Sequence, residues 1–295
     1  MKNFLRVVLG AAVASVLVTA LAGWGVFKDG APSFDVRPGK KMRVAAPAIQ
    51  MTESEREDFM GGKPVCRLID TEGEAKAGYM RLMLPYDPPT AWRIVTDVGC
   101  FDLQSAEFPK NGSLGEKRRT FMPYVFDSAH CTENGTFYLY QLLVLPFIDP
   151  RHFSLDRVPN RDGFPWETSW KQVPGLKCQS GWNKGMDKFR ESAVLTERNV
   201  GAWHLSPLPK EFVKSKADLL KTDTVYWVDS NPGGNVGSMT AIVNKATKTA
   251  LPALADSLLF LGTQFDAHMR KYHIDDLKEW EEERAAYKEA VGYEP

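Results

Sequence analysis

The last third of the chain carries a long helical pattern of apolar residues. From Ser238 onward, apolar side chains recur at steps of three, four and seven, which places them on one face of an α-helix. These positions are Met239, Ile242, Val243, Ala246, Ala250, Leu254, Leu258, Phe265 and Met269. So broad a stripe needs a large partner surface. Pro252 lies within the stripe and predicts a kink that can act as a hinge.

The segments upstream of this helix predict a β-rich partner. Alternating or β-branched and aromatic stretches bounded by turn residues indicate strands. The Asn134-Gly135 pair is a strong hairpin-turn signal between two of them. The predicted strands cover residues 65–70, 77–84, 120–126, 136–145, 151–158, 166–173, 188–196, 201–205 and 224–229.

Shorter helices interrupt the strands. Thr52 and Glu55 form a capping-box pattern that opens a helix ending at Met60. Apolar spacing predicts a second helix over residues 90–98 and a short amphipathic one over 210–220. The order is helix, hairpin, helix, antiparallel meander and long helix. This order predicts an α+β domain whose helices lie to one side of an antiparallel sheet.

The N-terminus predicts membrane targeting. Lys2 and Arg6 precede an uncharged run from Val7 to Phe27, which is long enough for a span of roughly 20 residues. The small residues Ala20 and Ala22 also fit a signal-peptide cleavage site, so residues 1–27 are either a signal peptide or an N-terminal membrane anchor. A retained anchor favours a cytoplasmic domain, because more basic residues follow the run than precede it. A cleaved signal peptide predicts an exported, periplasmic or secreted domain.

The remaining chain divides by composition. Residues 28–50 are rich in proline and basic side chains and read as a linker. Residues 51–275 hold all the predicted strands and helices and form one domain. Residues 276–295 are strongly charged, which predicts a solvated helical extension outside the core.

Charge and cysteine content exclude some functions and leave others open. Lys plus Arg equals Asp plus Glu, 37 against 37, so no overall field attracts nucleic acid and we expect no nucleic-acid partner. The four cysteines fit either two disulfides or buried free thiols, and no metal-type spacing occurs. They are Cys66, Cys100, Cys131 and Cys178.

Three local motifs occur in an order that resembles one superfamily. They are the stretch Asp149-Pro150-Arg151-His152-Phe153-Ser154-Leu155-Asp156-Arg157, the stretch Gly201-Ala202-Trp203-His204-Leu205-Ser206-Pro207, and the turn Asp229-Ser230-Asn231-Pro232-Gly233-Gly234 followed by Ile242-Val243-Asn244. With the element order, they make residues 55–265 similar to the START and START-like (helix-grip, SRPBCC) lipid-binding domains. Two features depart from the pattern. His152 stands where the family usually has Asp, and Asn244 lies further beyond Gly234 than usual, without the usual Pro before the helix.

The resemblance implies a fold and a function. The expected fold is a curved antiparallel sheet wrapped around a long C-terminal helix, enclosing a hydrophobic cavity. The expected function is to bind, and to transfer or sequester, a lipid or sterol-like ligand near a membrane, without a cofactor. The residues expected to line the cavity are Phe153, Leu155, Arg157, Trp166, Trp170, Trp203, Tyr226, Met239, Ile242, Val243 and Ala246. The alternatives are a cyclase-like or hydrolase-like enzyme on the same fold, and an interaction module with a filled core.

The sequence predicts no catalytic residue and no metal ligand. There is no Gly-x-Ser-x-Gly elbow, and the histidines are scattered. If the domain were an enzyme, His152 is the first candidate for a catalytic group, and it would have to lie inside the cavity. Arg157 shares a strand face with Phe153 and Leu155. It therefore lies either in water at a strand end, the commoner place for arginine, or inside, where it anchors a ligand hydroxyl or carboxylate.

Overall fold

The fold was analysed in a computed structural model. It describes Pro47 and residues 49–71, 76–96, 125–143, 149–182, 184–237, 239–272 and 274–293. The predicted signal peptide or anchor, most of the linker, residues 120–124 of one predicted strand and Cys100 lie outside these ranges. Within the described ranges, no helix is both long enough and apolar enough to cross a membrane.

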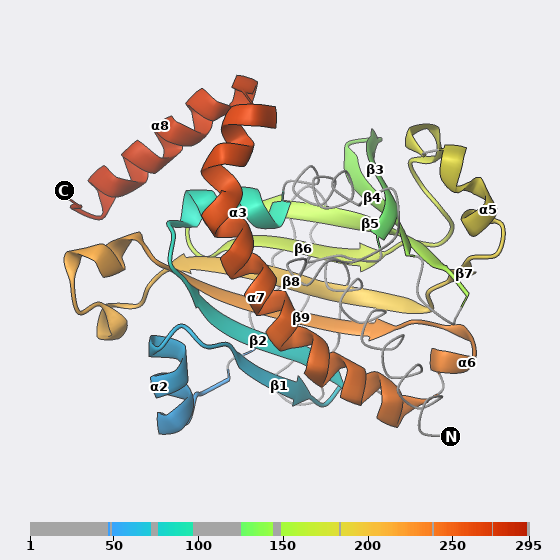
Figure 1. Cartoon of the computed structure of the whole chain (residues 1–295), viewed down its shortest axis with the longest axis horizontal. Coiled ribbons are helices and arrows are strands. Elements are labelled where there is room, and N and C mark those ends of the chain that lie inside the picture. The colour runs from blue at the N-terminus through green and yellow to red at the C-terminus, as the bar shows by residue number, and fades with distance from the viewer. Residues whose placement is uncertain are drawn as a thin grey trace.

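A nine-stranded sheet forms the body of the described structure (Figure 1). Eight strands run in the order β1-β2-β9-β8-β6-β5-β4-β3, all antiparallel, and β7 pairs in parallel with β5. Their bounds are β1 Val65–Ile69, β2 Ala77–Leu84, β3 Val125–Glu133, β4 Thr136–Leu143, β5 Arg151–Asn160, β6 Trp166–Gln172, β7 Val194–Leu195, β8 Arg198–Pro207 and β9 Thr222–Asn231.

The long C-terminal helix α7 (Thr240–Tyr272) crosses one face of this sheet diagonally and packs against β1 and β2 (Figure 1). We call this side of the sheet the inner face and the opposite side the outer face. The predicted stripe is buried at Val243, Ala250, Leu254, Leu258, Phe265 and Met269. Gly78 of β2 permits the close approach of the helix, because a Cβ there would lie 2.6 Å from a methyl carbon of Thr247. The predicted α+β, helix-grip arrangement is confirmed.

The remaining helices are short and lie around the sheet. They are α2 Glu53–Met60, α3 Pro88–Thr96, α5 Asp187–Arg190, α6 Gly234–Gly237 and α8 Ile274–Ala290, with single-turn 3-10 helices over 179–181, 184–186, 210–212 and 216–220. The predicted capping box of α2 is present, since Thr52 Oγ1 accepts a hydrogen bond from Glu55 N and Glu55 Oε2 accepts one from Thr52 N. Helix α3 starts at Pro88, earlier than predicted, because proline suits the first turn of a helix.

Three predictions of secondary structure were wrong or only partly right. Residues 188–196 are not a strand, since α5 occupies their first part and only Val194–Leu195 pairs with β5. The buried Arg190 explains this turn, because it binds Asp127 and Asp187 at 2.5 and 2.7 Å. Of the strand predicted over 120–126, only the last two residues are described, and they begin β3, which extends to Glu133. Residues 210–220 form two 3-10 turns in place of one α-helix.

Helix α8 is charged, but it is not the solvated extension that the sequence predicts. Trp280 and Tyr287 lie seven residues apart on one face, and both are buried. Trp280 Nε1 donates to Thr90 Oγ1 at 3.3 Å, and its ring packs edge-on against Phe265 at 5.5 Å between centroids. The Tyr287 hydroxyl donates to the Leu219 carbonyl at 2.9 Å. Trp280 therefore docks α8 onto α3 and α7, and Tyr287 docks it onto the 3-10 turn at 216–220. Two charged residues of α8 add ion pairs, Arg284 with the buried Asp87 and Glu283 with Arg161.

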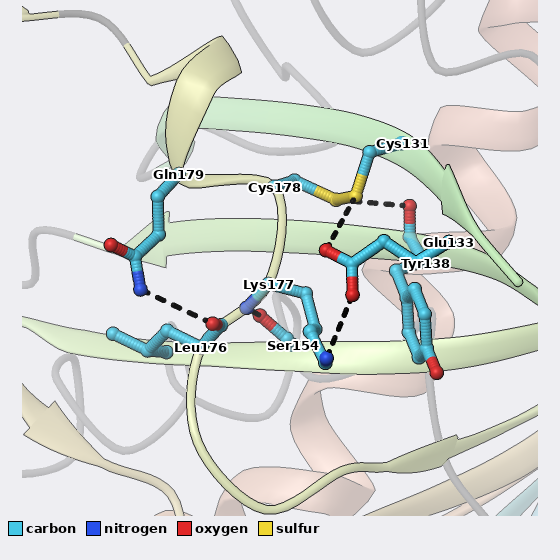
Figure 2. The surroundings of a disulfide bond; sticks show 8 residues. All are labelled: Cys131, Glu133, Tyr138, Ser154, Leu176, Lys177, Cys178 and Gln179. Atoms are coloured by element: carbon cyan, nitrogen blue, oxygen red, sulfur yellow. Dashed lines mark hydrogen bonds and ion pairs between the residues drawn. A yellow bond between two sulfur atoms is a disulfide. The ribbon is translucent and has the colours of Figure 1, made fainter.

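A disulfide between Cys131 of β3 and Cys178 ties the segment after β6 to the sheet (Figure 2). The segment is also held by Lys177, whose backbone N–H donates to Ser154 Oγ at 2.8 Å and whose ammonium lies 2.8 Å from Glu133. Cys178 adopts a left-handed backbone conformation with φ 62°. Cys66 is a free thiol, and burial raises its pKa to about 12. The sequence left disulfides and free thiols open for the cysteines. Among the described cysteines, Cys131 and Cys178 form a disulfide and Cys66 is a free thiol.

Candidate ligand-binding site

Four adjacent strands each place a large side chain with a polar group on the inner face. Arg157 of β5 stands opposite Trp170 of β6, and Trp203 of β8 stands opposite Tyr226 of β9. Because these strands are neighbours in the order β5-β6-β8-β9, the four side chains form one continuous cluster. Trp170, Trp203 and Tyr226, three of the residues expected to line the cavity, share one hydrophobic cluster with Leu254 and other residues of α7.

The Tyr226 ring packs against both tryptophans of this cluster. The ring centroids of Trp203 and Tyr226 are 4.3 Å apart, and those of Trp170 and Tyr226 are 6.2 Å apart. Gly201 of β8 lies opposite Trp170 and leaves room for its ring. A Cβ at Gly201 would come within 3.0 Å of that ring and 2.2 Å of the Trp227 carbonyl oxygen. The glycine of the Gly-x-Trp motif is therefore required by the packing of the site.

Arg157 is buried, with 4% of its surface exposed. The commoner, exposed position considered for it from the sequence is wrong. Its Nη2 atom donates to the Val95 carbonyl at the end of α3, at 3.1 Å, and to Thr168 Oγ1, at 3.3 Å. Burial lowers the pKa of Arg157 to about 10, so the guanidinium stays charged at neutral pH. The side chain therefore places a positive charge inside the domain.

Several buried polar atoms of the inner face have no hydrogen-bond partner in the structure as described. Within the cluster these atoms are Arg157 Nη1, Trp170 Nε1, Trp203 Nε1 and Tyr226 OH. Burial also holds the pKa of Tyr226 well above its usual range, so its phenol stays protonated. Both side-chain amide atoms of Gln141 in β4 and the hydroxyl of Thr224 in β9 are also buried without a hydrogen-bond partner. The outer face also holds unpaired atoms, among them both ring nitrogens of His204, but those of the inner face lie together on neighbouring strands. Native proteins pair most buried polar atoms, so this inner cluster needs an explanation.

The other residues predicted to line the cavity lie in different surroundings. Phe153, Leu155 and Val243 are buried, the first two on the inner face beside Arg157. Trp166 is half-buried at the edge of the core, with the Arg161 guanidinium 4.2 Å from its ring centroid. Met239 precedes α7 and is 46% exposed, so it lies away from the cluster. The side chains of Ile242 and Ala246 lie outside the described part of the structure.

Sequence reasoning missed Gln141, Thr224 and Trp280. Gln141 alternates with Leu139 and Leu143 along β4, so strand periodicity alone was enough to place it on the inner face. Thr224 alternates with Tyr226 and Val228 in the same way along β9. Trp280 had no such signal, because its neighbours in α8 are charged.

His152 lies on the outer face, where its ring contacts Tyr140 at 6.4 Å between centroids. Burial and the nearby charge of Arg190 lower its pKa. The one histidine that the enzyme hypothesis singled out therefore does not face the inner cluster. Among the residues that the structure describes, no group of three or more His, Cys, Asp or Glu side chains is arranged to hold a metal ion.

The outer face holds a hollow of about 430 Å³, lined by β2, β8 and β9 beneath Pro47 and Ile49. Arg81 and Asp223 form a two-bond ion pair at its wall, with distances of 2.9 and 2.6 Å. His204 is 3% exposed in this hollow, and burial lowers its pKa to about 4. This hollow is separated from the inner cluster by the thickness of the sheet.

Comparisons with known proteins found a resemblance among solved structures only. No protein-family model and no curated protein matches the sequence. Similar solved structures include a STAR-related lipid transfer protein from Xanthomonas axonopodis (18% identical, TM-score 0.44, covering 66% of this chain and 93% of that one). Human STARD10 is 12% identical, with TM-score 0.49 and coverage of 81% and 89%. Human StAR-related lipid transfer protein 5 is 11% identical, with TM-score 0.46 and the same coverage. At these identities and TM-scores, the likeness says nothing of what this chain binds.

Proposed function

We propose that this protein binds a lipid or sterol-like molecule between the inner face of its sheet and helix α7, and sequesters or transfers it. The observation that carries the proposal is the set of unpaired polar atoms within an otherwise apolar cluster of buried residues. Each such atom in a solid core costs about 1–3 kcal/mol. A bound molecule with a polar head and a hydrocarbon body removes that cost and buries its own apolar surface at about 25 cal/mol per Å².

A ligand can enter such a site only when the element that covers the inner face moves. Helix α7 crosses the inner face and contains Pro252, which removes one backbone hydrogen bond of the helix. Its far end is held by Trp280 of α8, which packs against Phe265. We infer that ligand exchange needs a displacement of α7 or of an adjoining loop, as in other proteins whose sites are closed by a mobile element.

We further propose that the domain works in an oxidising compartment close to a membrane. Two features support this. The apolar run of residues 7–27 has the length and flanking charge of a targeting segment. The Cys131–Cys178 disulfide is of a kind that persists in exported proteins and is rare in reducing compartments. The mass of the mature protein tests this proposal, because cleavage after Ala22 and an intact disulfide together require an exported domain.

Native mass spectrometry tests the binding proposal. The protein is purified from its host without detergent, and its native mass is compared with the mass after organic extraction. We expect a non-covalent mass increment that extraction removes, and a hydrophobic molecule in the extract. Absence of any such molecule, together with no thermal stabilisation by fatty acids, monoacylglycerols, phospholipids or sterols, would overturn the proposal.

A further inference from the structure

The polar atoms at the centre of the inner face differ from an ordinary mixed set of donors and acceptors. Arg157 Nη1, Trp170 Nε1 and Trp203 Nε1 can only donate hydrogen bonds, and Tyr226 OH can donate as well as accept. All four are unpaired in the structure as described, and they come from four neighbouring strands of the sheet. A molecule that satisfies them together must present several acceptor atoms to this group of strands.

The charge of Arg157 narrows the range of possible ligands further. Its two bonded partners, the Val95 carbonyl and the Thr168 hydroxyl, are both neutral, and no carboxylate of the described chain pairs with it. Arg190 is also buried, with 7% of its surface exposed, but it binds two carboxylates, those of Asp127 and Asp187. A buried charge without a counter-charge costs several kcal/mol, so the Arg157 site lacks one negative charge.

Resting on the proposed function, we propose that the ligand is an anionic lipid whose head is a single carboxylate or phosphate group. Its oxygen atoms accept hydrogen bonds from Arg157, Trp170, Trp203 and Tyr226, and its charge neutralises Arg157. A guanidinium suits this task because its planar N–H groups match the oxygen atoms of carboxylates and phosphates.

The tail has a defined direction along β5. Leu155 and Phe153 follow Arg157 on the inner face, and both are fully buried. Phe153 stands opposite Gln141 of β4, four residues along the strand from Arg157, which is about 13 Å at strand spacing. The hydrocarbon chain therefore lies against Leu155 and Phe153, and Gln141 marks the far end of this stretch.

Binding of matched pairs of probes to the full chain tests this proposal. Oleate is compared with its neutral ester methyl oleate, and lysophosphatidate is compared with neutral monoolein, by competition against a fluorescent fatty acid. We expect an anionic probe to bind about 10- to 100-fold more tightly than its neutral counterpart, the range of a charge-assisted hydrogen bond. The pair with the larger preference identifies the head as carboxylate or phosphate.

Three variants separate the possible outcomes. Arg157→Met is expected to abolish the preference for the anionic probe while keeping the affinity for the neutral one, which also shows that the variant is folded. Trp203→Phe, which deletes one donor and keeps an aromatic ring, is expected to reduce the preference several-fold. Arg56→Met, on exposed helix α2, is the control and is expected to leave the preference unchanged.

The results distinguish the two proposals. Equal binding of charged and neutral probes by the wild-type protein overturns the anionic head and leaves lipid binding intact. A preference that survives in Arg157→Met overturns the role of Arg157. Failure of all four probes, with no co-purifying hydrophobic molecule, overturns the lipid-binding function itself.

Discussion

Replacing Trp280 with alanine tests whether α8 is part of the fold. The side chain is 1% exposed, packs edge-on against Phe265, and donates a hydrogen bond to Thr90. Removal of a buried tryptophan costs about 3–5 kcal/mol, since the indole's transfer energy is lost and a cavity remains. With a urea m-value of about 3 kcal/mol per M, this loss lowers the unfolding midpoint by about 1–1.7 M.

Ile274→Ala is the matched control on the same helix. Ile274 is 70% exposed, so its truncation is expected to change stability by less than about 0.5 kcal/mol. Urea unfolding of the full chain, followed by circular dichroism, measures both variants. If Trp280→Ala costs no more than Ile274→Ala, then α8 is the solvated extension that its charged sequence predicts, and its docking onto α3 and α7 is wrong.

Three further predictions concern the disulfide, a buried histidine and a glycine. The Cys131–Cys178 bond joins two residues that are 47 positions apart, and its reduction is expected to lower the free energy of unfolding by about 4 kcal/mol. The same loss is expected in a Cys66→Ser control, because Cys66 is a free thiol. Denaturation with and without reductant measures the loss, and no difference would contradict the disulfide. His204 has a folded pKa of about 4 against an ordinary 6.5, so below pH 6.5 the unfolded chain takes up a proton that the folded chain does not. Stability is therefore expected to fall by about 3 kcal/mol between pH 6.5 and 4, and His204→Phe should remove this part of the pH profile; identical profiles would refute the burial of the imidazole. Gly201→Ala is expected to destabilise the protein by about 1–3 kcal/mol, because its Cβ would lie 2.2 Å from a backbone oxygen, and an unchanged denaturation midpoint would show that the strand register is wrong.

The fold was largely predictable because it follows from local periodicity. Helix α7 has an apolar stripe with a 3.6-residue period, and β5 has alternating apolar residues at Phe153 and Leu155. Each pattern identifies a buried face even when the segment that covers this face is not known. These are properties of single elements, and a sequence carries them directly. The common site of Trp170 and Tyr226, in contrast, was an expectation from the family resemblance and not from alternation.

The predictions that were wrong concern residues whose positions depend on contacts between distant segments. The burial of Arg157 depends on a carbonyl of α3, 62 residues away, and the docking of Trp280 depends on Thr90, 190 residues away. The helical turn at Arg190 likewise needs Asp127 on a different strand. No local pattern encodes such partners, so the sequence favoured the more frequent outcome, an exposed arginine and a solvated charged helix.

The disulfide also makes part of the chain a covalent ring. Residues 131–178 enclose β4, β5 and β6, so the ring carries both Arg157 and Trp170. A protease that cuts the β5–β6 connection, where Phe164 is exposed, leaves two fragments joined through sulfur. A single nick there severs the hairpin without releasing either strand, and the two halves of the site separate only after cleavage is combined with reduction.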